Sequence, residues 1–152
     1  MPTVFTASYD GTTKVLSVVV CLGLCAAVLL VHNLFVTFTS VAVIVLGYAY
    51  SPRSYSISGR EIIVKRLIGS VRVPLDRLKE ARLVTPDDLR GGIRLWGSGG
   101  MFGYYGLFRT TKLGNCRWYV TNRRNMVVVV TESKTTLYSP DDTEGFLAAV
   151  EG

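Results

Sequence analysis

Few side chains in this sequence could do acid–base or metal chemistry. His32 is the single histidine, and it lies in the apolar N-terminal third of the chain. Because histidine is the side chain used most often for proton transfer and is a frequent metal ligand, residues 51–152 lack the residue that most such sites require. We expect His32 to be a polar turn residue rather than a proton relay or a ligand.

Three cysteines could offer thiolate chemistry or metal ligands. Cys21 and Cys25 would share one face of a helix, but no histidine or carboxylate close by completes a metal shell. Cys116 has no neighbouring base, and an odd, sparse cysteine count is typical of a reducing compartment rather than of a disulfide framework. The first two are therefore expected to be small buried apolar side chains.

Two pairs of adjacent carboxylates, Asp87–Asp88 and Asp141–Asp142, are the remaining candidates for catalysis. Each pair follows a proline in a segment typical of a turn or a helix cap. The sequence thus predicts no catalytic residue, no metal site and no cofactor, and a protein that is not an enzyme.

The segment 91–106 is rich in glycine and aromatic residues and is a candidate contact surface. It lacks the Gly-Lys-Ser/Thr ending of a phosphate-binding loop, and no strand–helix pair flanks it as in a dinucleotide site. Either it is a long loop folded over the domain with its aromatic rings in the core, or it is an exposed surface that docks on the membrane interface or on a partner. The side chains concerned are Trp96, Met101, Phe102, Tyr104 and Tyr105.

A second candidate surface is basic and would attract anionic lipid. Each well-placed basic residue contributes about 1 kcal/mol to such attraction, and no pocket is needed. The net charge of +6 could also suggest nucleic acid, but basic residues that follow an apolar segment are explained by membrane topology, so no nucleic-acid partner is expected. The basic candidates are Arg53, Arg60, Lys65, Arg66 and Arg72.

The elements that must position these residues begin with an apolar region. Residues 1–50 contain only two charged side chains, Asp10 and Lys14, and none lies between Val15 and Tyr50. As one helix, 15–50 would be about 54 Å long, far more than a hydrocarbon core of about 30 Å. We predict a transmembrane helical hairpin, with spans at 15–31 and 34–50 joined at the polar pair 32–33.

Flanking charges set the expected orientation. Basic residues precede the first span and follow the second, whereas the turn between them has no lysine or arginine. The positive-inside rule then predicts a multi-pass protein of the inner cell membrane with both termini cytoplasmic. A cleaved signal peptide or a buried soluble helix pair are the alternatives. Small residues in the first span, namely Gly23, Ala26 and Ala27, leave a homo-oligomer open as a further partner.

The remainder, 51–152, has the texture of a small β-rich domain. About seven short strand patterns are separated by turns, and Ser139-Pro140-Asp141-Asp142 predicts the cap and first turn of a C-terminal helix. The fold class expected is α+β, with a partly open, roughly seven-stranded barrel capped by that helix. In the leader 1–14, apolar and polar residues alternate from Phe5 to Asp10, which predicts a strand paired with an edge of the domain.

Several of these features together resemble the membrane-anchored bacterial pleckstrin-homology-like (PH-like) domain proteins. The resemblance rests on the order of two spans, Ser51-Pro52, a basic first hairpin, the block from Gly97 to Tyr104, and the Ser-Pro-Asp ending. It implies a PH-like barrel with a C-terminal helix. In lipid-binding relatives a basic first hairpin holds phosphoinositide headgroups, but adjacent Lys65 and Arg66 would point to opposite faces of a strand.

The function expected on these grounds is a non-enzymatic, membrane-anchored adaptor or scaffold. Its PH-like domain would hold a protein partner at the cytoplasmic face, since peptides can add a strand to an exposed sheet edge. The alternative is binding of anionic lipid headgroups by the same domain. In both cases the lipid bilayer itself is a partner.

Overall fold

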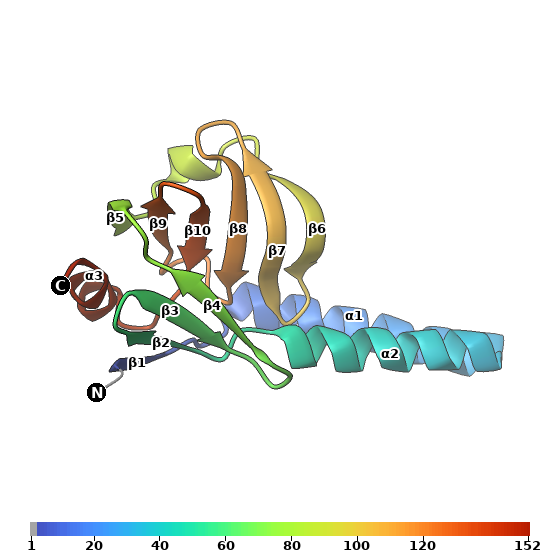
Figure 1. The fold of residues 1–152 in the computed structure, drawn as a ribbon. Helices are drawn as coiled ribbons and strands as arrows, with labels where there is room; N and C mark the ends of the chain where they lie inside the picture. Colours follow the sequence, from blue (N-terminus) through green and yellow to red (C-terminus); the bar gives the residue numbers. More distant parts are fainter. Residues whose placement is uncertain (1–2) are drawn as a thin grey trace.

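Two apolar helices project together from one side of the molecule. In the computed structural model, which describes residues 3–152, α1 covers Gly11–Val31 and α2 covers Leu34–Tyr50. His32 adopts the left-handed conformation that ends α1, with φ of 47°, and the Asn33 side chain caps α2 by accepting a hydrogen bond from Phe35 N at 2.8 Å. The chain therefore reverses at the polar pair, and the helices run side by side away from the sheets (Figure 1).

Of the two predicted membrane spans, 15–31 and 34–50, only the first lies in a helix that is a candidate span, although α2 has the predicted bounds. α1 has 21 residues and is long and apolar enough to cross a membrane, with only 6% of its apolar window buried. It begins earlier than expected because Asp10 caps it and brings 11–14 into the helix. α2 has 17 residues, since it is confined between its cap and Pro52, and it falls short of the usual span of about 20 residues.

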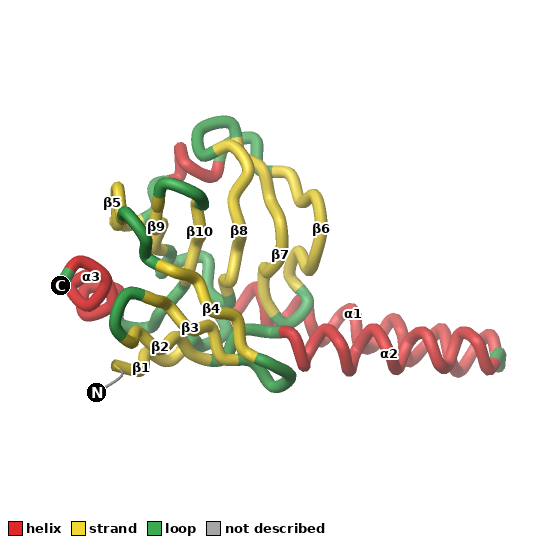
Figure 2. Tube along the Cα trace, viewed as in Figure 1, coloured by secondary structure: helices red, strands yellow, loops and turns green. Residues whose placement is uncertain are grey.

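The β-structure forms two sheets rather than the single seven-stranded barrel that was expected. The first sheet has the order β1-β2-β3-β4 and the second β5-β9-β10-β8-β7-β6, with β10 and β8 parallel and all other pairs antiparallel. Figure 2 shows the two sheets facing each other with the helical pair at one side. The strands are β1 (Thr3–Thr6), β2 (Ser54–Ser58), β3 (Glu61–Lys65), β4 (Ser70–Pro74), β5 (Leu78–Leu83), β6 (Ile93–Gly100), β7 (Gly103–Thr110), β8 (Gly114–Val120), β9 (Val127–Thr131) and β10 (Thr135–Tyr138).

One reason for the higher strand count is the leader. β1 pairs antiparallel with β2, with Phe5 opposite Tyr55, at the edge of the first sheet. The alternation of residues 5–10 predicts a strand here, but β1 ends at Thr6 and residues 7–10 lie outside it. The Asp141 carboxylate accepts hydrogen bonds from the hydroxyls of Thr6 and Ser8 at 2.7 and 2.8 Å, which ties the leader to the C-terminal part of the chain.

The other reason is the segment 91–106, which is a hairpin and not a loop. β6 and β7 pair along their whole length, and Gly97 lies opposite Gly106 with φ of 108° and 128°. A Cβ atom on either glycine would collide with the backbone of the opposite strand. The glycines therefore permit two strands to approach at a distorted point, a use that the apolar–polar periodicity of a strand does not reveal.

One core cluster lies between the two sheets and is closed at one end by α3 (Thr143–Glu151). A second cluster lies on the other face of the second sheet, against Leu89 of a short 3₁₀ helix, η1 (Pro86–Leu89). Figure 1 shows α3 beside both sheets. Phe146 of α3 is fully buried and packs with Tyr55 of β2 and Tyr138 of β10, at ring-centroid distances of 5.9 and 5.6 Å. The aromatic rings join the two sheets to the helix, as the amphipathic C-terminal pattern predicts.

The predicted cap of the C-terminal helix is displaced by three residues. α3 begins at Thr143, and its N-cap is Asp142, whose carboxylate accepts a hydrogen bond from Gly145 N at 2.9 Å. Ser139 is instead fully buried, and its hydroxyl accepts hydrogen bonds from the amides of Thr121 and Asn122 at 2.8 and 3.2 Å. The amides after β8 need a hydrogen-bond acceptor, and the Ser139 hydroxyl serves them instead of capping the helix.

Candidate functional site

The turn between β6 and β7 is inserted against both helices. Phe102 at its tip has φ of 53°, and its ring packs edge-on against Tyr48 of α2 at a centroid distance of 5.4 Å. A Cβ atom at Gly47 would lie 2.5 Å from the terminal methyl of Met101, so this side chain would have to move. The hairpin thus reaches the helices at a point where α2 has no side chain, and we call this contact region the junction.

Hydrogen bonds fix the junction. Phe102 N donates to the Ser17 hydroxyl of α1 at 2.8 Å, and the Ser51 hydroxyl donates to Phe102 O at 2.6 Å. The Tyr105 hydroxyl donates to Gly47 O at 2.6 Å, one of the last four carbonyls of α2 that have no partner within the helix. Burial of this hydroxyl raises the pKa of Tyr105, so it remains a donor at neutral pH.

The start of α1 is tied to the second sheet as well. The Asp10 carboxylate accepts hydrogen bonds from Thr13 N at 2.7 Å, within the helix, and from Arg123 N at 3.0 Å, beyond the end of β8. The Thr13 hydroxyl donates to Thr121 O at 3.1 Å. Helix and sheet share these buried groups, so the helical pair is held rigidly to the domain.

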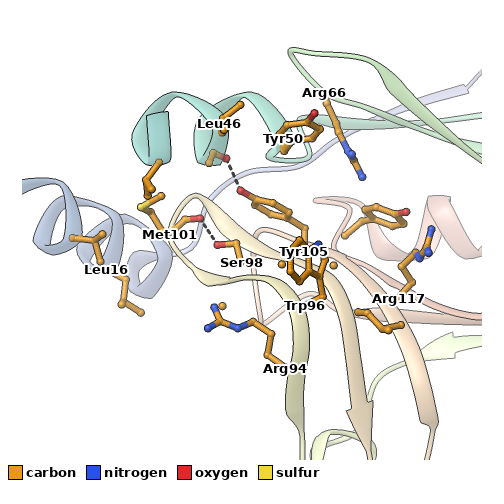
Figure 3. Close-up of a pocket in the computed structure, with 18 residues that line it drawn as sticks. Leu16, Leu46, Tyr50, Arg66, Arg94, Trp96, Ser98, Met101, Tyr105 and Arg117 are labelled. Carbon is orange, nitrogen blue, oxygen red and sulfur yellow. Dashed lines mark hydrogen bonds between the residues drawn. The ribbon is translucent and has the colours of Figure 1, made fainter. Parts of the chain in front are cut away.

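Beside the junction lies an open pocket of about 980 Å³. The two helices form one wall, through Leu16, Val20, Val43 and Leu46, and the outer strands of the second sheet form the other (Figure 3). Most of its exposed lining is apolar, yet three arginines border it and no carboxylate among the described residues does. Those arginines are Arg66, Arg94 and Arg117.

The charges of these three arginines are not neutralised within the described part of the chain. None has a carboxylate oxygen within 4.0 Å, whereas Arg72, Arg77, Arg82 and Arg90 each do. The guanidinium of Arg66 lies over the rings of Tyr119 and Tyr50 at 5.2 and 5.9 Å, and its Nε atom is buried without a hydrogen-bond partner. The pocket therefore combines an apolar lining with uncompensated positive charge.

The predicted aromatic surface is divided by the structure. Trp96, Met101 and Tyr105 line the pocket, and Phe102 lies at the junction. Tyr104 is 7% exposed and belongs to the core beside Trp118 and Phe108. Tyr104 therefore belongs to the core and Trp96 is exposed, and docking of the segment on a membrane or a partner stays a prediction.

The predicted basic surface is dispersed. Of its five members only Arg66 lines the pocket. Arg53 is exposed and lies over the Tyr48 ring at 4.7 Å, Arg60 is exposed in the β2–β3 turn, and Arg72 lies 3.6 Å from Glu61. Lys65 is exposed at the end of β3.

Sequence reasoning missed Arg94 and Arg117 as site residues. They lie on β6 and β8, 23 positions apart, with β7 between the two strands. Only the pairing of 93–100 with 103–110 brings them to one pocket, and the interpretation of 91–106 as a loop hid that pairing.

One surface of the domain faces the direction in which the helices project. β6 ends the second sheet on that side, and the β3–β4 turn lies close to the start of the projection (Figure 1). Large apolar side chains are exposed on both elements, with exposures of 80% for Trp96, 61% for Ile93 and 57% for Leu67. We call these residues, with Leu95 and Ile68, the helix-side surface.

Comparison with known proteins identifies the class of the domain. Residues 53–152 match the family described as Bacterial PH domain, which covers more than half of the chain. The protein belongs to this bacterial PH domain family, with an apolar helix in front of the domain. No curated protein and no solved structure matches the chain.

Membership of this family has a functional consequence. PH domains are generally non-catalytic domains that mediate interactions. Among residues 3–152 no cluster of histidine, cysteine or acidic side chains could hold a metal ion. The chain is therefore best described as an interaction module joined to an apolar helix.

We expect Asp10→Ala to loosen the joint between α1 and the domain. The variant removes a buried helix cap and leaves Arg123 N without its acceptor, which should cost about 1–2 kcal/mol of unfolding free energy at neutral pH. Burial alone would raise the pKa of Asp10, but hydrogen bonds from Thr13 and Arg123 lower it below its ordinary value. A lowered folded-state pKa stabilises the fold above about pH 4, and this contribution is lost as the pH falls further.

The measurement is thermal or denaturant unfolding of detergent-solubilised protein at about pH 7 and about pH 3. The difference in unfolding free energy between wild type and Asp10→Ala should be large at the higher pH and small at the lower one. Asp76→Ala, which removes an exposed carboxylate, is the control and should leave stability unchanged. An equal difference at both pH values would contradict the role assigned to the Asp10 carboxylate.

Proposed function

We propose that this protein is a non-enzymatic, membrane-anchored interaction module that holds its PH domain against the inner leaflet. The helical pair inserts as a hairpin, with both of its ends on the cytoplasmic side. The domain then contacts anionic lipid through the helix-side surface and leaves the opposite side free for a protein partner.

The position of the helix-side surface is the observation that carries this proposal. Its exposed apolar side chains lie on the side of the domain toward which the apolar helices point, so insertion of the helices would bring them to the bilayer. Scattered apolar side chains on a protein surface need no explanation, but a group of them on one face marks a contact region. Tryptophan in particular favours the membrane interface.

Helix length supports the same placement. The domain contacts α1 as far as Ser17 and α2 at Gly47, which leaves 18–31 and 34–46 beyond these contacts. These segments rise about 20 Å, less than the hydrocarbon core of about 30 Å. A hairpin this short can reach across the core only if the bilayer extends to the junction, and the domain then touches the headgroups.

The orientation rests on charge. Lys14 precedes the apolar part of α1 and Arg53 follows α2, whereas the turn at 32–33 carries no lysine or arginine. The positive-inside rule places both helix ends in the cytoplasm. The short α2 is the reason to test this directly.

Topology is measured with a single cysteine introduced as Asn33→Cys in a variant without the three native cysteines. We expect a membrane-impermeant thiol reagent to label this position from outside intact cells, and a cysteine introduced as Ser133→Cys to react only after the membrane is opened. Labelling of position 133 in intact cells would contradict the cytoplasmic placement. Lack of labelling at position 33, with labelling after solubilisation, would indicate a hairpin that enters the bilayer without crossing it.

Contact with the bilayer is measured through the two tryptophans. Trp96 is 80% exposed on β6, whereas Trp118 is 4% exposed and stacked on Phe108 at 4.2 Å. In vesicles whose lipids carry bromine near the glycerol, the fluorescence of the Trp118→Phe variant, which retains Trp96, should be strongly quenched. The Trp96→Phe variant, which retains Trp118, should be little affected.

Equal and weak quenching of both variants would show that the domain stands away from the bilayer, and the proposal would fall. Because Trp118 is a core residue, circular dichroism of the Trp118→Phe variant verifies that the fold is retained. Its replacement by another aromatic ring keeps the stacking on Phe108.

A protein partner is the second candidate function, and a different surface favours it. A cleft of about 540 Å³ lies between the end of α3 and the β2–β3 turn, on the side of the domain opposite to the free ends of the helices (Figure 1). Arg60, Arg77 and Glu151 line it, and Arg77 is paired with Glu132 at 2.7 Å. Arg60 has no described carboxylate within 4.0 Å and would attract an acidic segment of a cytoplasmic partner.

A photo-reactive residue placed at Ala149, which lines this cleft, should form an adduct with the partner in intact cells. Arg60→Glu combined with Arg77→Glu should abolish that adduct, because the reversed charges repel an acidic segment. Lys134→Glu, in an exposed turn away from the cleft, should leave it intact. An adduct that survives the double reversal would exclude an acidic partner at this cleft.

A further inference from the structure

The pocket beside the junction has two chemically different ends. Figure 3 shows Leu16 and Met101 on one side of Trp96 and Tyr105, with the Arg94 guanidinium below them, and Arg66 and Arg117 on the other side. The first end is formed by the helices, which project into the proposed bilayer, and the second by the sheet and the chain after β3. A ligand that satisfies both ends must be apolar at one end and anionic at the other.

Arg66 is the pocket arginine whose surroundings are most unusual. Its guanidinium is held over Tyr119 and Tyr50, and its buried Nε atom donates to no protein group. A buried donor without an acceptor costs about 1–3 kcal/mol, and more when it is charged. The planar guanidinium is suited to a phosphate or a carboxylate, to which it can donate two parallel hydrogen bonds.

The remaining charges around the pocket are of the same sign. Arg117 and Arg94 are exposed, and no described carboxylate lies within 4.0 Å of either. Elsewhere on the domain four of the nine arginines lie within 4.0 Å of a described carboxylate, whereas none of the three around the pocket does. A free inorganic anion would satisfy these charges but would leave the apolar wall of the helices exposed to water.

We infer that the pocket is a binding site for a single anionic phospholipid. The phosphate lies between Arg66 and Arg117, and one acyl chain follows Leu16, Val20, Val43 and Leu46 into the bilayer. The volume of about 980 Å³ is at the upper end for sites that bury small amphiphilic ligands. The inference rests on the proposed placement of the domain at the inner leaflet and adds a defined lipid to it.

The anchor and the domain build this site jointly. Leu16, Val20, Val43 and Leu46 belong to the helices, which precede the residues 53–152 matched by the family, whereas Arg66 and Arg117 belong to the domain. The site is also separate from the exposed basic residues of the first sheet, of which Arg60 and Arg72 do not line the pocket. These two arginines therefore offer a charge-matched control.

The test is native mass spectrometry of the full chain released from nanodiscs that contain equal amounts of phosphatidylglycerol and phosphatidylcholine. Wild type should retain one phospholipid for each chain, and it should be phosphatidylglycerol. Arg66→Gln combined with Arg117→Gln should lower this retention about tenfold or more, because each arginine contributes about 1 kcal/mol or more to binding the phosphate. Arg60→Gln combined with Arg72→Gln removes the same charge and should retain the lipid.

Loss of the lipid in the control pair, or equal retention in all variants, would overturn the inference, as would retention of phosphatidylcholine in equal amount. If the double variant Arg66→Gln with Arg117→Gln does not fold, lipid retention is compared between wild type and Arg117→Gln alone, because the Arg117 side chain is exposed. Quenching of Trp96 by brominated lipid is read in the same samples. Quenching without a retained lipid would refute this site and leave the membrane-docked module standing, whereas absence of both would refute the two together.

Discussion

The arrangement of this protein depends on satisfying backbone polar groups where the two helices meet the domain. The last carbonyls of α2 lack the partners that a continuing helix would provide. The Tyr105 hydroxyl and the amide of Ile68 reach Gly47 O and Ala49 O, at 2.6 and 3.3 Å, and satisfy them. At the hairpin tip, the backbone N–H and C=O of Phe102 also require partners, and the hydroxyls of Ser17 and Ser51 provide them. Each bond joins the domain to a helix, so satisfying these groups also fixes where the domain sits.

The glycines between 91 and 106 follow from this constraint. The β6–β7 hairpin lies between the two helices and the rest of the second sheet. Its two strands must therefore approach each other closely, and its tip must approach α2 closely. The glycine pair 97 and 106 permits this approach between β6 and β7, and Gly47 permits it between the tip and α2. The pocket is a by-product of the same packing, because the narrow tip touches the helices while the broader strands behind it stand apart. The glycines let the tip of the hairpin contact α2 closely, and the pocket lies beside this contact.

Local patterns in the sequence were sufficient for much of the fold. Charge-free length and the polar pair His32–Asn33 predicted the helical hairpin, and alternation in the leader predicted β1. The features that the sequence did not predict depend on pairing between residues far apart in the chain. Glycines at positive φ give no alternation, so the pattern predicts a loop where β6 lies and does not indicate that the pocket arginines are neighbours. Ser139 carried a good local capping signal, yet buried amides at 121 and 122 took its hydroxyl. α2 covers the predicted 34–50, and it ends there because Pro52 follows, not because of the thickness of a bilayer.

On the proposed membrane placement, the PH domain has a role different from that of a recruiting module. A soluble lipid-binding domain must gain enough affinity from headgroups to remain at the membrane, whereas a domain attached to an inserted helix is already there. Lipid contact then cannot serve for targeting, and its effect is on position and orientation. With a rigid junction and a short hairpin, a phospholipid between Arg66 and Arg117 would fix the tilt of the domain relative to the leaflet. The cleft near α3 would in turn be presented to the cytoplasm at a constant height, which is what a scaffold for a cytoplasmic partner requires.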